Sequence, residues 1–168
     1  MKKIPAYVRY LICPIAFLLI SSSSHANHLV GMDLFYTYVS GNTYKITLIA
    51  YGDCGSASTT TAFSALSTNS PQVHIYNGST FISSINLIIQ PPSAGVEITP
   101  VCPADISLTQ CTNPSYTIPG IKKFVYSANY TLSGPSAAWR FLFTGQMTGS
   151  IAGRALTITN ISSSPDTW

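Results

Sequence analysis

The feature that most constrains the fold is a two-residue alternation of apolar and polar side chains, which recurs in separate segments of the chain. Every second residue is apolar in residues 44–50 and 124–132, and the pattern returns in Trp139, Phe141 and Phe143. Successive side chains of a β-strand point to opposite faces, so this is the pattern of half-buried strands. No segment sustains the roughly 3.6-residue apolar period of an amphipathic helix. We therefore predict an all-β fold.

Turn signals divide the alternating segments into about seven strands. Ser40-Gly41-Asn42 links strands at residues 29–39 and 43–51, and Asn77-Gly78 links strands at residues 72–76 and 80–90. Asn-Gly is a strong hairpin signal because both central residues of a type I′ turn need positive φ. The proline-rich residues 93–119 cannot hold a regular ladder and should form a loop. A single antiparallel β-sandwich, immunoglobulin-like or jelly-roll-like, is the expected architecture.

The N-terminus has the pattern of a cleaved signal peptide. Lys2, Lys3 and Arg9 precede an apolar run at residues 11–20, which is too short to span a bilayer, and Ser24-His25-Ala26 offers small residues at a cleavage site. We predict a signal peptide at residues 1–26 and one β-sandwich domain at residues 27–168. The protein should then be secreted or held at the cell surface, with no membrane span after cleavage.

Charge argues against a nucleic-acid partner. The formal charge of +3 comes from the predicted signal peptide, because residues 27–168 contain five basic and five acidic side chains. Only Lys122 and Lys123 are adjacent, whereas nucleic-acid binding needs a clustered basic face. A neutral surface repels other molecules weakly, which favours a domain that is tethered or part of an assembly.

Three cysteines remain after the predicted cleavage: Cys54, Cys102 and Cys111. An exported protein can form disulfides, and Cys102 and Cys111 share one proline-rich loop. A bridge between them would stabilise the fold by about 2–3 kcal/mol, so we favour it over a bridge from Cys54 to either one. Cys54 is then left over. No C-x-x-C occurs, and His28 and His74 have no ligand-spaced companions, so neither a metal nor a cofactor is expected.

The acidic residues do not form a recognisable catalytic set, and we predict that the chain is not an enzyme. Asp33 and Asp53 are the most interesting, because neighbouring strands could bring them together across a hairpin. The favoured alternative gives Asp53, which lies between Gly52 and Gly55, a role in a turn.

Aromatic residues make a carbohydrate-binding module the main rival to a structural role, with polysaccharide as the partner. Sugar rings stack on exposed aromatic side chains. Trp139 is in phase with Phe141 and Phe143 and should be buried. Tyr51 and Tyr76 fall on the less apolar faces of their strands, so they are the candidate ligand-binding residues.

The segments HLVG (residues 28–31) and YKITLIAYGDC (residues 44–54) resemble the N-terminal domain of large secreted or cell-surface proteins of Bacteroidetes. The resemblance continues through VCPADISLTQC, YTIPGIKKFVYSANYTL and RALTITNIS, and so covers most of residues 27–168. Those proteins carry repeated immunoglobulin-like or PKD-like modules and a gliding-motility-associated C-terminal sorting domain read by the type IX secretion system. The motif residues carried over are His28, Val30, Gly31, Tyr51, Asp53 and Cys54.

The resemblance implies a non-catalytic structural or adhesion module with a link to gliding or surface attachment. Its partners would be downstream domains of the same polypeptide or other surface proteins. The chain departs from the family pattern at Met32, where a second glycine is usual, and at Gly52, where an arginine is usual. It also lacks a twin cysteine after the Trp139 segment, which implies that Cys54 is unpaired or paired outside the chain.

Overall fold

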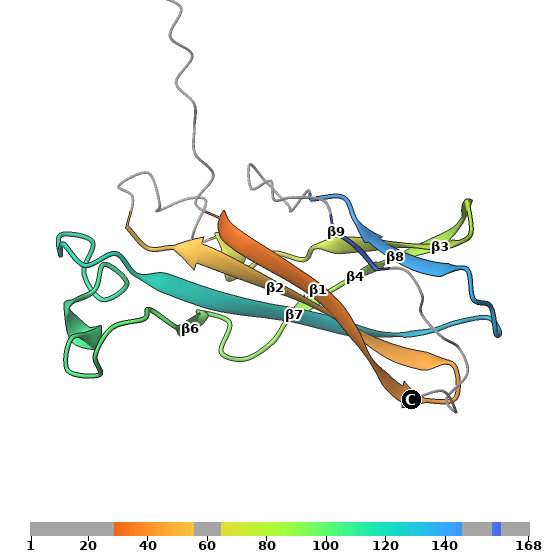
Figure 1. Ribbon diagram of the computed structural model, residues 1–168, viewed down its shortest axis with the longest axis horizontal. Helices are drawn as coiled ribbons and strands as arrows, with labels where there is room; N and C mark the ends of the chain where they lie inside the picture. The colour runs from red at the N-terminus through yellow and green to blue at the C-terminus, as the bar shows by residue number, and fades with distance from the viewer. Residues whose placement is uncertain (1–28, 56–64, 146–155, 159–168) are drawn as a thin grey trace, which may run out of the picture.

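The computed structural model describes residues 29–55, 65–145 and 156–158 and shows two antiparallel β-sheets packed as a sandwich (Figure 1). The predicted all-β sandwich is confirmed, with nine strands in the described residues where about seven were expected. The predicted signal peptide lies outside them. The strands are β1 (Leu29–Ser40), β2 (Thr43–Asp53), β3 (Gln72–Asn77), β4 (Thr80–Asn86), β5 (Ile88–Ile89), β6 (Val96–Glu97), β7 (Ile121–Thr131), β8 (Trp139–Phe143) and β9 (Leu156–Ile158).

The five-stranded sheet has the order β1-β2-β7-β5, and β6 also pairs with β7. Its first hairpin turns where the sequence predicts, with Gly41 at a φ of 55°. β2 and β7 pair along the whole of β2, from Thr43 opposite Thr131 to Asp53 opposite Ile121. This ladder is the central pairing of the sheet, and it sets which loop residues meet at its ends.

The four-stranded sheet has the order β4-β3-β8-β9. The predicted hairpin between β3 and β4 is present, but its loop is Gly78-Ser79 and not Asn77-Gly78, because Asn77 still pairs with Thr80. Gly78 has a φ of 61°. The predicted single strand at residues 80–90 is wrong, because β4 ends at Asn86 and β5 pairs with β7 in the other sheet. The chain crosses between the sheets at Leu87, which is fully buried and donates its backbone N–H to the carbonyl oxygen of Pro71 at 2.8 Å.

The core lies between the two sheets and is made by the alternating apolar residues. Trp139 is buried as predicted, and its Nε1–H donates to the carbonyl oxygen of Gly134 at 2.9 Å. The buried Tyr126 hydroxyl donates to the carbonyl oxygen of Leu66 at 2.6 Å. The indole N–H of Trp139 and the hydroxyl of Tyr126 therefore each have a hydrogen-bond acceptor. The buried apolar set is Tyr44, Ile46, Leu48, Ala50, Leu66, Val73, Ile75, Leu87, Phe124, Tyr126, Leu132, Trp139, Phe141 and Phe143.

The proline-rich segment at residues 93–119 is mostly loop, as predicted. It also contains the two-residue β6, which places Val96 opposite Lys123, and a short 3-10 helix, η1 (Ile106–Leu108). In Figure 1 the part of this segment that follows β6 forms the left-hand end of the sandwich, beyond the end of β2.

Candidate functional site

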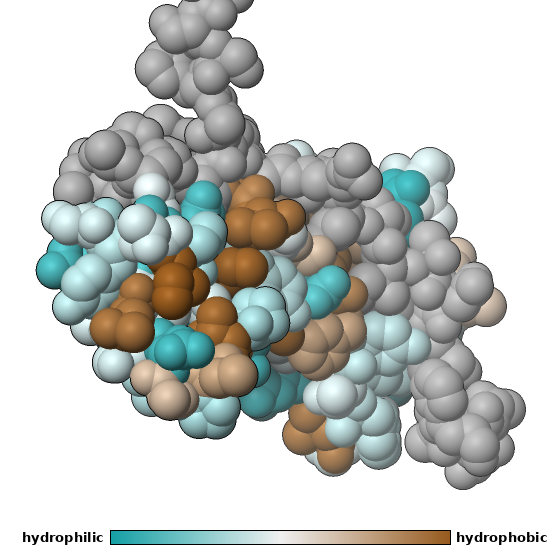
Figure 2. Space-filling model, turned by 60° about the vertical axis from the view of Figure 1, so that its left-hand side comes forward, coloured by the Kyte–Doolittle hydropathy of each residue, from teal (hydrophilic) through white to brown (hydrophobic). Residues whose placement is uncertain are grey.

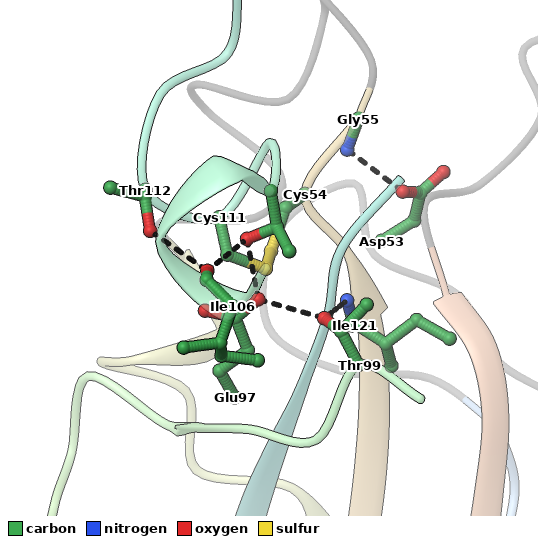
Figure 3. The surroundings of a disulfide bond; sticks show 10 residues. Asp53, Cys54, Gly55, Glu97, Thr99, Ile106, Cys111, Thr112 and Ile121 are labelled. Atoms are coloured by element: carbon green, nitrogen blue, oxygen red, sulfur yellow. Dashed lines mark hydrogen bonds between the residues drawn. A yellow bond between two sulfur atoms is a disulfide. The ribbon is translucent and has the colours of Figure 1, made fainter. Parts of the chain in front are cut away.

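Cys54 and Cys111 form a disulfide with their Cα atoms 4.9 Å apart (Figure 3). Cys102 is an exposed free cysteine. The predicted Cys102–Cys111 bridge is therefore wrong, and so is the expectation that Cys54 is unpaired or paired outside the chain. The cause is the β2–β7 ladder. Cys54 follows β2 and donates its backbone N–H to the carbonyl oxygen of Gly120 at 2.8 Å. A Cβ at Gly120 would lie 2.5 Å from the Sγ of Cys111, so this glycine lets the bridge approach.

A cluster of hydrogen bonds is a second attachment, besides the disulfide, between the loop that carries Cys111 and the sheet (Figure 3). The Glu97 carboxylate accepts from the hydroxyls of Thr99 at 2.8 Å and Thr109 at 2.5 Å. Thr99 Oγ1 in turn accepts the backbone N–H of Ile121, the first residue of β7, at 3.0 Å. Since both threonines are buried, these bonds replace water and tie the loop to the sheet.

Asp33 and Asp53 are not brought together across the hairpin. Asp33 lies opposite Ile49, four positions before Asp53 on β2, which separates the two backbone positions by about 13 Å. Asp53 Oδ1 accepts the backbone N–H of Gly55 at 2.8 Å (Figure 3), which is the predicted turn role.

Tyr51 is half-buried on the outer face of the five-stranded sheet. Its hydroxyl donates to Asp33 Oδ2 at 2.8 Å, and its ring lies against Gly31, where a Cβ would be 3.5 Å from Cδ2. The hydrogen bond to Asp33, together with burial, raises the pKa of Tyr51 above its usual value. This candidate residue is thus held to its own sheet at both the ring and the hydroxyl.

Tyr76, the other candidate, is half-buried on the outer face of the four-stranded sheet. In the register, Tyr76 lies opposite Phe81 on β4 and opposite Arg140 on β8. The Arg140 guanidinium carbon lies 4.7 Å from the centroid of the Tyr76 ring, and the Phe81 ring meets it edge-on at 5.6 Å. A phenyl ring, a phenol and a guanidinium therefore form one row across three strands.

Polar side chains continue this face along β3. His74 lies opposite Ser84 and Leu142, and its ring is 5.8 Å from that of Phe81. Gln72 lies opposite Asn86, and its Nε2 donates to Asn86 Oδ1 at 3.2 Å. We call this set the Tyr76 face. It consists of Gln72, His74, Tyr76, Phe81, Ser84, Asn86, Arg140 and Leu142.

Arg140 is the one Lys, Arg, Asp or Glu in the described strands of the four-stranded sheet. Within residues 29–55, 65–145 and 156–158, its Nε, like the Nδ1 of His74, is buried without a hydrogen-bond partner. The acidic residues that the structure describes lie elsewhere, on β1, β2, β6 and the loop before η1. The face can therefore stack on a flat apolar surface and attract an anion.

Sequence reasoning identified Tyr76 but missed Phe81, Arg140 and His74. A two-residue loop at Asn77-Gly78, as predicted from the sequence, would pair Tyr76 with Ser79. The observed loop is Gly78-Ser79, and it places Phe81 opposite Tyr76 instead. Arg140 could not be found from this turn either, since the pairing of β3 with β8 joins segments far apart in the chain.

The end of the sandwich that carries the disulfide exposes apolar side chains. Val96, Ile98, Ile106 and Leu108 are exposed to between 37% and 47%. Figure 2 brings this end forward and shows hydrophobic side chains gathered among hydrophilic ones. Exposed apolar groups of this kind are typical of contact surfaces.

Comparisons with protein-family models, curated proteins and solved structures find no match. The described residues contain no group of three His, Cys, Asp or Glu side chains arranged to hold a metal ion. They also contain no helix long and apolar enough to cross a membrane. The family resemblance therefore stays a prediction.

Proposed function

We propose that this protein is a non-catalytic structural or adhesion module, exported to the cell surface or medium. The observation that carries the proposal is the Cys54–Cys111 disulfide in an antiparallel sandwich, which is compatible with an oxidising, extracellular setting. The nearby acidic groups support it as well. The Asp53 carboxylate accepts a hydrogen bond within a turn, that of Glu97 accepts one within a loop, and that of Asp33 accepts one from the Tyr51 hydroxyl. Each of these carboxylates therefore has a structural role.

The sequence supports a more specific form of the proposal. The N-terminal signal pattern and the Bacteroidetes resemblance favour an N-terminal module of a larger exported protein, with a type IX sorting domain further along the polypeptide and a role in gliding or surface attachment. The exposed apolar group Val96, Ile98, Ile106 and Leu108 fits a contact with downstream domains or with other surface proteins.

The intact, non-reduced mass of the native protein, recovered from the cell surface and the medium and sequenced at its N-terminus, tests this proposal. We expect a species that begins at Asn27 and is far heavier than this chain. A free, stable, monomeric product in the medium with no larger precursor would overturn the module proposal. A species that retains residues 1–26 would overturn signal cleavage alone.

Carbohydrate binding is the second candidate function, and the Tyr76 face favours it. Phe81 is 53% exposed beside Tyr76, and polar side chains surround the two rings, as sugar stacking with hydrogen bonds to hydroxyls requires. Glycan-array binding that is lost in Phe81→Ala but kept in Tyr51→Ala, with both variants folded, is the expected result. Loss of binding only in Tyr51→Ala would place the site on the other sheet.

A further inference from the structure

We propose that the Tyr76 face binds an acidic polysaccharide, whose sugar rings carry carboxylates, and that Arg140 receives a carboxylate. The inference rests on the carbohydrate-binding candidate and names its ligand class. It begins from the row Phe81, Tyr76 and Arg140, which crosses β4, β3 and β8. Adjacent strands lie about 4.8 Å apart, so the row spans about 10 Å. That length suits an extended saccharide chain with one ring near Phe81 and a charged group at Arg140.

The guanidinium of Arg140 is held in place before any ligand arrives. It stacks on Tyr76 at 4.7 Å, and Arg140 is half-buried. Folding has therefore already removed much of the conformational entropy that this flexible side chain would otherwise lose on binding. Arginine binds carboxylates through two parallel N–H donors, a geometry that a lysine lacks. Since no described carboxylate pairs with it, the positive charge of this sheet is available to an external anion.

The rest of the face fits a sugar better than an acidic peptide. Phe81 offers an exposed apolar ring to the C–H face of a sugar, and Ser84, Gln72 and Asn86 are exposed groups that hydrogen-bond hydroxyls. A strongly acidic peptide would need several cations, whereas the described strands here provide one. A ligand with spaced carboxylates and many hydroxyls matches this charge density.

The test uses the full-length protein with its disulfide formed, titrated with polygalacturonate, alginate and hyaluronate by calorimetry. Polygalacturonate is compared with its methyl ester, which keeps the sugar backbone and removes the charge. Arg140→Met and Arg140→Gln remove the guanidinium, Arg140→Lys keeps only the charge, and Lys45→Met is the matched control because Lys45 is an exposed cation on the other sheet. Thermal unfolding confirms that each variant is folded.

We expect at least one acidic polysaccharide to bind, with affinity about 10- to 100-fold lower in Arg140→Met and Arg140→Gln, the range for a lost charge-assisted hydrogen bond. Arg140→Lys should be intermediate, Lys45→Met unchanged, and binding should weaken as salt is raised. Equal affinity for polygalacturonate and its methyl ester would overturn the carboxylate inference and leave carbohydrate binding standing.

Two other results separate the remaining hypotheses. Equal binding of a glutamate oligopeptide with the same number of charges would overturn the saccharide as the ligand. Failure of all three acidic polysaccharides would overturn the inference, and the carbohydrate-binding candidate is then judged by neutral glycans on the array. Binding to neutral glycans that needs Phe81 but not Arg140 would keep that candidate and reject this one.

Discussion

Removing the disulfide should cost this protein a large part of its stability. The bridge closes a segment with a sequence separation of 57 residues. The chain-entropy relation gives about 4 kcal/mol for a ring of this length, against about 2.6 kcal/mol for the ring of about ten residues between Cys102 and Cys111. For a domain of this size, a loss of about 4 kcal/mol lowers Tm by about 10–20 °C. The double variant Cys54→Ala/Cys111→Ala should show this loss, whereas Cys102→Ala should stay within about 0.5 kcal/mol of the wild type.

Urea unfolding followed by Trp fluorescence measures the effect, with the reduced wild type as a second comparison. Alanine is the better replacement at Cys54 because this side chain is buried and a serine hydroxyl there would need a partner. The reduced wild type and the double variant should have the same free energy of unfolding. If the double variant lost less than about 1 kcal/mol, or if Cys102→Ala were the destabilised protein, the reasoning would be refuted.

Peptide mapping tests the connectivity directly. Trypsin alone cannot separate the cysteines, because no Lys or Arg occurs between Lys45 and Lys122. A protease that also cuts at acidic residues cleaves at Glu97 and Asp105 and so places the three cysteines on three peptides. We expect the Cys54 peptide to be linked to the Cys111 peptide, and Cys102 to be alkylated without reduction. A linkage that includes Cys102 would contradict the structure.

Three further predictions concern the scaffold. Gly120→Ala should destabilise the fold by about 1–3 kcal/mol, because its Cβ would meet Cys111 Sγ at 2.5 Å, whereas Gly134→Ala has open space and should be tolerated in the same urea assay. Thr99→Val leaves the Ile121 N–H without its acceptor, so it should cost about 1–3 kcal/mol and speed amide exchange at Ile121. Thr112 is exposed, so Thr112→Val should change neither the stability nor the amide exchange at Ile121. Burial raises the pKa of Tyr126 above its usual value of 10.0, so its stabilising effect is complete below pH 10 and falls above it as the unfolded state ionises. Tyr126→Phe removes the hydrogen bond to the carbonyl oxygen of Leu66 and should therefore be less stable than wild type at pH 8. Denaturation curves should show this difference in the free energy of unfolding narrowing above pH 10, and a difference that stays constant would contradict the assignment.

The strands that could be predicted are those whose pattern is local. The alternation in residues 44–50 and 124–132 depends only on neighbouring residues, and the structure confirms it. The hairpin signal at Asn77-Gly78 is also local, and the hairpin is present with its turn one residue later, at Gly78-Ser79. β5 could not be predicted, because Ile88 and Ile89 continue the apolar pattern of β4 while they pair with Ser127 and Tyr126 in the other sheet. The switch depends on Leu87 entering the core, which is a property of the packing and not of the local sequence.

The disulfide and the Tyr76 face show the same limit for the site. The sequence favoured a bridge between Cys102 and Cys111 because the two cysteines share one proline-rich loop. In the folded state the β2–β7 register decides, because it carries Cys54 to Gly120 and hence to Cys111. In the same way, the sequence predicts that Tyr76 lies on the less apolar face of its strand, and only the β3–β8 register places Arg140 over its ring. Both features are made by strand pairs that are distant in the chain, and a strand pattern says which residues face outward but not which outward residues meet. The chemistry proposed for this protein therefore depends on the register of the two sheets. A substitution elsewhere in the chain that shifts the register of β8 should abolish the contact between Arg140 and Tyr76, even though the residues of the Tyr76 face are unchanged.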